Sequence, residues 1–304
     1  MKLFDLHCDT LTALFEKNCD LNSRDTAVSL DGMLEFEKCI RSFAIWIPDN
    51  LPDGEIDNYF NALYSAFNRQ LSLFSDKVVK VTDKKSLLDP RIGVMLAIEN
   101  GAALNGSLLN IQKMADLGVK LFTITWNGEN SLGYGQLKNR RLKPFGRECI
   151  PLLEENGIII DVSHLSKRGF DDVCAICKKP FVASHSNSMS VTKHNRNLND
   201  DQIREIIRRR GLIGLNFYRG FLNKNFDKAS EIDILRHAEY ILSLGGEDVL
   251  AIGTDFDGAD TINGFKKDID LLKLEPLFLQ NGFSREITDK ILFKNAEKFF
   301  IENL

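Results

Sequence analysis

The 304-residue sequence has little of what marks disulfide-rich, membrane or nucleic-acid-binding proteins. Its 6 cysteines are too few for a disulfide scaffold, and we expect them to be reduced thiols. The longest apolar runs, such as IGVMLAI at residues 92–98, are far shorter than the roughly 20 residues of a membrane helix. Lys and Arg total 39 against 43 Asp and Glu, and the resulting net charge of −4 argues against broad nucleic-acid binding.

The first residues also lack the pattern of a secretory signal. Asp5, His7 and Asp9 interrupt the stretch that would have to be apolar, so we expect a cytoplasmic protein. The composition, 43% hydrophobic and 27% charged, is that of an ordinary globular protein. The length suits two domains or one α/β barrel, and we expect residues 1–304 to form a single barrel domain.

Cysteine chemistry is not indicated either. Cys174 and Cys177 form a C-x-x-C pair, but a zinc role would need a second ligand pair and a redox role a redox fold. The surrounding DDVCAICKK is typical of a helix with both cysteines on one face. We expect a structural role for them.

Strand-like runs alternate with helix-like runs along the whole chain. The sequence predicts eight strands, at residues 3–9, 39–48, 92–99, 119–126, 157–164, 180–185, 211–218 and 248–255. Eight strands alternating with helices predict an α/β fold, a (β/α)₈ TIM-type barrel. An open doubly wound sheet is the alternative, although no G-x-G-x-x-G follows the first strand, which disfavours a dinucleotide-binding version.

Two of the helices carry clear end signals. Asn199 is a cap for DDQIREIIRRR, and Gly211 is expected to end that helix. Its three arginines therefore favour a helix terminus over a nucleic-acid patch. A second helix begins after Ser230 and is expected to end at Gly245 and Gly246.

Polar residues occur where the predicted strands end. In a barrel these ends share one rim, which is where the active site of such enzymes lies. Three of the 5 histidines of the chain fall there together with carboxylates, and this set of nitrogen and oxygen ligands predicts a metal site. The candidate ligands are His7, Asp9, Glu99, His164 and His185, with Asp255 as a further carboxylate.

Five ligands exceed the three that one catalytic zinc ion uses. Two ions sharing a carboxylate would account for all five, with Zn²⁺ favoured and Mn²⁺, Co²⁺ or Fe²⁺ as substitutes. The other two histidines are weaker candidates. His194 is expected to be exposed in a loop, and His237 to lie on a helix in the core or behind the ligands.

Several segments together resemble the membrane dipeptidase (renal dipeptidase) family of zinc metallopeptidases, particularly its soluble bacterial members. They are FDLHCDTL, MLAIENG, LFTITWNGEN, IIDVSHLS, PFVASHSN, NRNLNDDQI, GLIGLNFY and VLAIGTDFDG, in the order of the family from residue 4 to about 258. The resemblance implies a (β/α)₈ metal-dependent hydrolase barrel with two Zn²⁺ per chain. One ion would be held by His7, Asp9 and Glu99, and the other by the bridging Glu99 with His164 and His185.

The resemblance also implies a dipeptidase that uses a metal-bridging hydroxide. Asp255 would join Glu99 as a catalytic residue and handle the protons of the water and the leaving amine. Arg196 and Tyr218 match positions that contact the substrate. The expected substrates are short peptides, including dipeptides with a C-terminal D-residue, and a homodimer is the expected assembly.

One position departs from the family pattern. Trp126 stands where the family often has a substrate-binding histidine, so Trp126 is expected either to line the pocket and contact the substrate or to pack in the barrel. Two alternatives stay open. The protein could be a related amidohydrolase or lactonase with a changed pocket, or a barrel that binds a ligand without catalysis.

Overall fold

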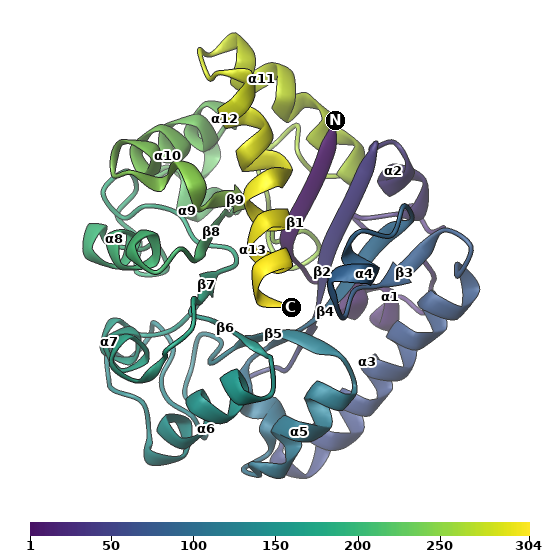
Figure 1. Ribbon diagram of the computed structural model, residues 1–304, viewed down its shortest axis with the longest axis vertical. Coiled ribbons are helices and arrows are strands. Elements are labelled where there is room, and N and C mark those ends of the chain that lie inside the picture. Colours follow the sequence, from purple (N-terminus) through teal and green to yellow (C-terminus); the bar gives the residue numbers. More distant parts are fainter.

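Strand β1 (Lys2–Cys8) begins a parallel sheet that closes on itself in the computed structural model, which describes residues 1–304. The other strands are β2 (Lys38–Trp46), β3 (Val78–Lys80), β4 (Ile92–Glu99), β5 (Val119–Thr123), β6 (Ile159–Asp161), β7 (Val182–Ala183), β8 (Leu212–Leu215) and β9 (Leu250–Ile252). The strand order is β2-β1-β9-β8-β7-β6-β5-β4, and pairing of β2 with β4 closes the ring. The expected (β/α)₈ barrel is therefore confirmed (Figure 1).

Helices surround this ring. They are α1 (Thr10–Glu16), α2 (Leu30–Leu34), α3 (Asp53–Leu73), α4 (Lys84–Leu87), α5 (Leu109–Asp116), α6 (Pro144–Glu155), α7 (Lys167–Ile176), α8 (Asp200–Arg208), α9 (Arg219–Leu222), α10 (Glu231–Ser243), α11 (Leu274–Gln280), α12 (Arg285–Asp289) and α13 (Asn295–Asn303). Short 3₁₀ or π turns occur at Gly101–Leu104, Phe226–Lys228, Gly246–Asp248, Asp268–Lys273 and Lys290–Lys294. None of the helices has the length and apolar character needed to cross a bilayer.

Each of the eight predicted runs contains a strand of the barrel, because apolar and β-branched residues buried on both faces suit a parallel sheet. Seven of these strands end earlier than predicted, whereas β4 ends at Glu99 as expected. The run at 157–164, for example, contains a strand only over Ile159–Asp161. Strand β3 was not predicted, and it extends the sheet beside the first residues of β4.

The two helices predicted from their end signals, α8 and α10, are confirmed except at one boundary. Asn199 caps α8 as expected, its side chain accepting a hydrogen bond from the backbone of Gln202. Gly211 does not end this helix, however, since Arg210 adopts the left-handed conformation with φ 57°. A glycine is needed at position 211 for a different reason. The Cβ of any other residue would lie 2.1 Å from the carbonyl oxygen of Phe181.

The two C-x-x-C cysteines are free thiols with different surroundings. Cys174 lies in α7, whereas Cys177 follows the helix in an extended conformation, so the two do not share a helix face as expected. The Cys177 thiol donates to the carboxylate of Glu154 at 3.0 Å. Arg209 ties the same region to α8 by donating to the carbonyls of both cysteines. These contacts support the structural role expected for both the cysteines and the arginine run.

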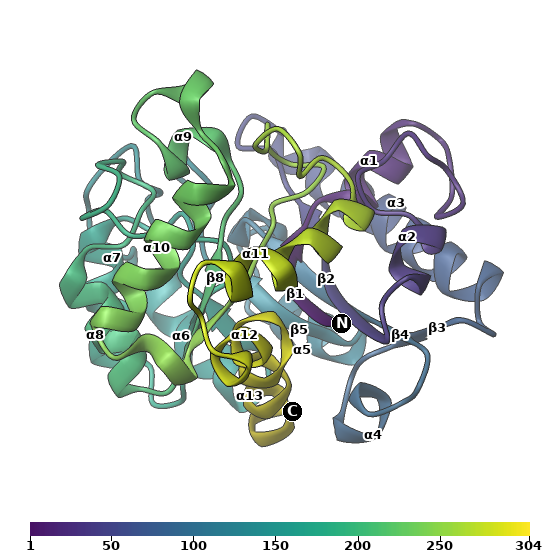
Figure 2. The ribbon, with the colours of Figure 1, turned by 90° about the horizontal axis from the view of Figure 1, so that it is seen from above.

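Helix α13 closes the amino-terminal end of the barrel, where it lies over the ring of strands in Figure 1. Phe300 of this helix is fully buried and stacks on Phe4 of β1, with ring centroids 5.0 Å apart. In Figure 2, α13 lies at the lower end of the molecule and α1 and α9 at the upper end. Helix α13 and the helices α1 and α9 thus lie at opposite ends of the barrel.

Candidate metal centre

The six predicted site residues at strand ends converge on the carboxyl-end rim. His7 is the penultimate residue of β1, and Asp9, just after the strand, is the N-cap of α1. Glu99 is the last residue of β4. The three remaining residues, His164, His185 and Asp255, follow β6, β7 and β9.

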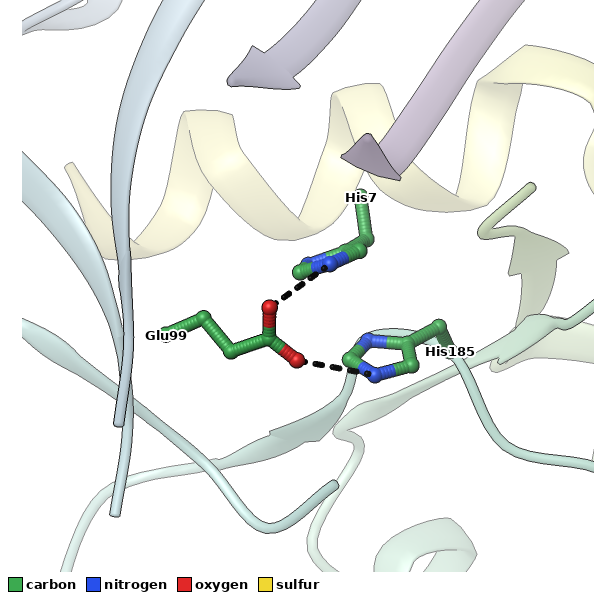
Figure 3. Close-up of side chains that lie close together, drawn as sticks. All are labelled: His7, Glu99 and His185. Atoms are coloured by element: carbon green, nitrogen blue, oxygen red, sulfur yellow. Dashed lines mark ion pairs between the residues drawn. The ribbon is translucent and has the colours of Figure 1, made fainter. Parts of the chain in front are cut away.

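Glu99 is the centre of this cluster, and its two carboxylate oxygens face different partners. Its Oε2 lies 3.6 Å from Nε2 of His7, whereas its Oε1 lies 2.9 Å from Nε2 of His164 and 3.7 Å from Nε2 of His185. Figure 3 shows Glu99 between His7 and His185. One carboxylate thus contacts two separate groups of ligand-type atoms.

His7 also faces the other two carboxylates. Its Nε2 lies 3.3 Å from Oδ2 of Asp9 and 3.9 Å from Oδ1 of Asp255. Two sets, one of His7, Glu99 and His185 and the other of His7, Asp9 and Asp255, each have their ligand atoms within 4.8 Å of one another.

The polar atoms of this cluster are poorly satisfied without a cation. Nε2 of His7 and Oδ1 of Asp9 are buried and have no hydrogen-bond partner. Nε2 of His164 and Nε2 of His185 face each other at 2.9 Å. Unpaired buried polar atoms are costly, and converging imidazole and carboxylate atoms are the ligands that zinc prefers. The residues therefore fit a metal centre.

Hydrogen bonds to the Nδ1 atoms orient the imidazoles of His164 and His185, whose Nε2 atoms face the cluster. Nδ1 of His164 lies 3.0 Å from Oδ1 of Asn127, and Nδ1 of His185 lies 2.7 Å from Oγ of Ser184. Asp161 accepts from the Ser184 hydroxyl and from the hydroxyl of Thr123. Such partners fix the orientation of metal-binding histidines.

Sequence reasoning missed these supporting residues. Asp161 lies inside the run predicted at 157–164, and only the structure shows that it is the last residue of β6. Asn127 and Ser184 carry no signal of their own, because only the barrel brings them to the histidines.

The backbone of the rim is unusual at two candidate site residues. His164 and Asp255 adopt left-handed conformations with φ 67° and 61°, and Asp257 does so with φ 66°. Such conformations disfavour residues with a Cβ, and they cluster at functional sites. They lie in the segments that follow β6 and β9.

Burial and neighbouring charges shift the pKa values of the cluster. Burial raises the pKa of Glu99 to about 8, and the nearby Asp9 acts in the same direction. Burial lowers the pKa of His164 and His185 well below the usual value. Burial alone would also lower the pKa of His7, but Glu99 and Asp9 outweigh it and raise that pKa well above normal. His164 and His185 are thus neutral, as metal ligands must be.

Asp255 and Arg196 lie beside the cluster. Burial raises the pKa of Asp255, whose Oδ2 accepts a hydrogen bond from the amide of Asn216 at 2.9 Å. Arg196 is buried, and its guanidinium lies 5.2 Å above the ring of Phe221. Burial lowers the pKa of Arg196 to about 10, so it remains charged at neutral pH, while its Nε has no partner.

An open cavity of about 510 Å³ covers the centre. Glu99, His164, Asp255, Arg196, Tyr218 and Trp126 all line it. Trp126 therefore contacts the cavity, where its ring packs edge-on against Trp46 at 5.1 Å. His194 lies in a loop as expected, but its expected exposure was wrong. It is half-buried, lines the cavity and packs on Phe221, 4.7 Å between centroids.

His237 takes the core position expected for it. It is fully buried in α10, and its Nδ1 accepts from the backbone amide of Ser188 at 3.1 Å. This contact holds the loop after β7.

A parallel (β/α)₈ barrel with imidazoles and carboxylates gathered on its carboxyl-end rim is the architecture of a metal-dependent hydrolase. Residues 1–302 match the family model of membrane dipeptidases, peptidase family M19. The chain therefore belongs to the membrane dipeptidase family and is a metallopeptidase by family. This confirms the family resemblance stated from the sequence.

Two curated relatives show how far the sequence similarity extends. An uncharacterized dipeptidase of Schizosaccharomyces pombe is 31% identical over 175 residues, covering 55% of this chain and 42% of that protein. The present chain thus matches less than half of that relative. An uncharacterized protein of the pqqA 5′ region of Klebsiella pneumoniae is 28% identical over 218 residues, which are 68% of this chain and 80% of that protein.

Solved structures share the fold over nearly their full length. A metallopeptidase from Rhodobacter sphaeroides, bound to a phosphinate mimic of the dipeptide L-Ala-D-Ala, superposes with a TM-score of 0.93 and 22% identity, covering 100% of this chain and 99% of that one. A probable dipeptidase from Pseudomonas aeruginosa gives a TM-score of 0.85 and 18% identity, with 99% and 95% covered.

Proposed function

We propose that the protein is a dinuclear zinc dipeptidase that hydrolyses the peptide bond of short peptides. The observation that carries this proposal is the placement of Glu99, whose Oε2 faces His7 and whose Oε1 faces His164 and His185. A carboxylate with one oxygen toward each ligand group is suited to bridge two ions. Membership of a metallopeptidase family supports the same function.

Each ion would have three ligands, and Glu99 would be shared by the two ions. His7, Asp9 and Glu99 would hold one, and Glu99, His164 and His185 the other. The chemistry that two zinc ions supply in such a site is polarisation of a carbonyl and a lowered pKa of water. Asn127 and Ser184 keep the imidazoles of His164 and His185 in place through hydrogen bonds to Nδ1.

Asp255 is the candidate acid and base. Its Oδ1 faces the cluster 3.9 Å from His7, and Asn216 holds its Oδ2. Its raised pKa suits a carboxylate that takes a proton from the attacking water and gives it to the nitrogen of the leaving amine. The left-handed backbone at Asp255 holds this side chain over the centre.

Arg196 is the candidate residue for binding the C-terminal carboxylate of the substrate. A guanidinium binds a carboxylate through two parallel hydrogen bonds, and Arg196 is charged, buried and only weakly hydrogen-bonded to Ser186 and to the carbonyl of His185, both at 3.4 Å. Tyr218 and Trp126 would complete the walls around the bound peptide. The dipeptide mimic in the Rhodobacter sphaeroides enzyme makes dipeptides ending in D-Ala a substrate class to test.

The test combines metal analysis with a substrate panel. Purified protein is expected to carry about two zinc ions per chain, to lose activity on chelation and to recover it with added Zn²⁺. Dipeptides are expected to be cleaved far faster than N-acyl amino acids or lactones. A preference for either of the latter would favour the related amidohydrolase or lactonase function. Metal-free protein with no metal-dependent activity would contradict the proposal.

A further inference from the structure

The cavity over the metal centre has opposite charges at its two ends. Arg196 lies in the loop after β7, whereas α1 follows β1, three strands further around the eight-stranded ring. The face of α1 that lines the cavity consists of Thr12, Ala13 and Glu16, at helical spacing from Asp9. Glu16 therefore lies at the outer end of the wall that begins with the candidate ligand Asp9.

Glu16 differs from the other acids of the cavity because it has no cation or hydrogen-bond donor. Asp257 accepts hydrogen bonds from Thr10 and from the backbone of Ala27, each at 2.7 Å. Asp260 pairs with Lys266 at 2.6 Å and with Arg219 at 3.4 Å. No ion pair or hydrogen bond involves the Glu16 carboxylate, which is exposed to the cavity.

Helix stability does not explain Glu16 either. It is the last residue of α1, where the helix dipole disfavours negative charge, and no basic residue occupies the last turn. A carboxylate in this position lowers rather than raises the stability of the helix. The Glu16 carboxylate is therefore free to pair with a cation that the protein itself does not supply.

The direction of a bound dipeptide follows from the proposed function. With its carboxylate on Arg196 and its peptide carbonyl over Glu99, its first residue lies on the side of α1. Glu16 lies seven residues after Asp9, which is about 10 Å along the axis at the α-helical rise. A side chain must be long to reach from the first residue to Glu16, and Lys and Arg carry a positive charge at the end of such a stem.

We propose that the enzyme prefers dipeptides whose first residue is basic, and that Glu16 is the residue that selects them. The small Ala13 leaves room along α1 for the aliphatic part of the side chain. An acidic first residue is disfavoured, since its carboxylate would approach Glu16 without an intervening cation. This inference rests on the proposed dipeptidase function and adds its substrate class.

The test compares L-Arg-D-Ala with L-citrulline-D-Ala on the zinc-loaded enzyme, because citrulline has the shape of arginine without its charge. The wild type is expected to favour the arginine dipeptide about fivefold in kcat/KM, which is the upper range for a solvent-exposed ion pair. The preference should shrink at high ionic strength. Glu16→Gln should bring the ratio close to one, and Glu16→Asp should retain part of the preference.

Asp260→Asn is the matched control, since Asp260 lines the same cavity but already has two cations. It is expected to leave the ratio unchanged. A wild-type ratio near one, an unchanged ratio in Glu16→Gln, or an equal loss in Asp260→Asn would overturn the inference while leaving the dipeptidase function intact. Failure to cleave any dipeptide would overturn the proposed function and this inference together.

Discussion

The two ends of the barrel bury side chains of opposite character. At the amino-terminal end, Phe4 of β1 stacks on Phe300 and packs near Phe293, whose ring lies 6.2 Å away. Three residues after Phe4, at the other end of the same strand, His7 is equally buried among carboxylates. One strand thus contributes to an aromatic plug at one end and to a charged centre at the other.

The buried side chains at one end of the barrel serve stability, and those at the other end serve function. Burial of an aromatic ring is favourable by itself, on the order of 1.5–3 kcal/mol for a fully buried side chain. Burial of ionisable groups costs free energy unless each is paired, and here Nε2 of His7 and Oδ1 of Asp9 have no hydrogen-bond partner. Stability therefore accounts for the aromatic end, whereas the charged end is explained by what it binds.

The largest effect is expected for Glu99→Gln. Loss of the charge shared by both ligand groups should weaken both metal sites and reduce activity to the background, as measured by elemental analysis and a dipeptide assay. Glu154→Gln is the control, because Glu154 is also a buried carboxylate but contacts Cys177 and the backbone of Lys179 away from the rim. It should lower stability and keep the metals. Full metal content in Glu99→Gln would rule out a bridging role.

Asp255→Asn is expected to reduce kcat by roughly 10²–10⁴, the usual contribution of a general acid or base. Metal content and thermal stability should stay close to wild type, because the amide fills the same space. Asp257→Asn serves as the comparison, since Asp257 is held by Thr10 and Ala27. Activity of Asp255→Asn within a few-fold of wild type would move the role to another group, with Asp257 the next candidate.

Arg196→Ala should raise KM for free dipeptides by about 10- to 100-fold, as expected for loss of hydrogen bonds between charged groups. The wild type should cleave C-terminally amidated dipeptides poorly, and the variant should discriminate less between acid and amide. The comparison is the acid-to-amide ratio of kcat/KM in the two proteins. The same ratio in the wild type and in the variant would show that Arg196 does not bind the substrate carboxylate.

Metal affinity should fall as the pH is lowered. Because burial raises the pKa of Glu99 to about 8, a proton must leave this carboxylate before it can bind a cation at neutral pH. His7, whose pKa is raised well above normal, must also lose a proton, whereas His164 and His185 add no such competition, since burial lowers their pKa. Zinc titrations below pH 8 should therefore show an apparent affinity that weakens by up to about tenfold per pH unit for each of the two protons. A flat profile between pH 6 and about 8 would contradict proton competition at Glu99.

Phe300→Ala should have the smallest effect on catalysis and a clear effect on stability. Removal of this buried ring from its stack on Phe4 is expected to lower the free energy of unfolding by about 3–5 kcal/mol. The variant should retain its metals and its kcat at temperatures where it is folded. A large loss of kcat in folded protein would show that the two ends of the barrel are coupled.

Much of the fold could be predicted because its signals are local. Apolar runs such as Ile92–Glu99 and caps such as Asn199 identify elements without knowledge of their neighbours. Strand β3 was missed because three residues make too short a run. The end of α8 was misassigned because Arg210, rather than the adjacent glycine, adopts the left-handed conformation.

Eight of the nine strands, the barrel and the six polar residues at the strand ends could be predicted, because residue type and spacing along one segment carry that information. Which atoms face one another depends instead on the folded chain: the two oxygens of Glu99, the support of His164 by Asn127, and the open position of Glu16 at the cavity wall. Such contacts join segments far apart in the chain, so they depend on closure of the barrel and on the turns after its strands rather than on any local pattern.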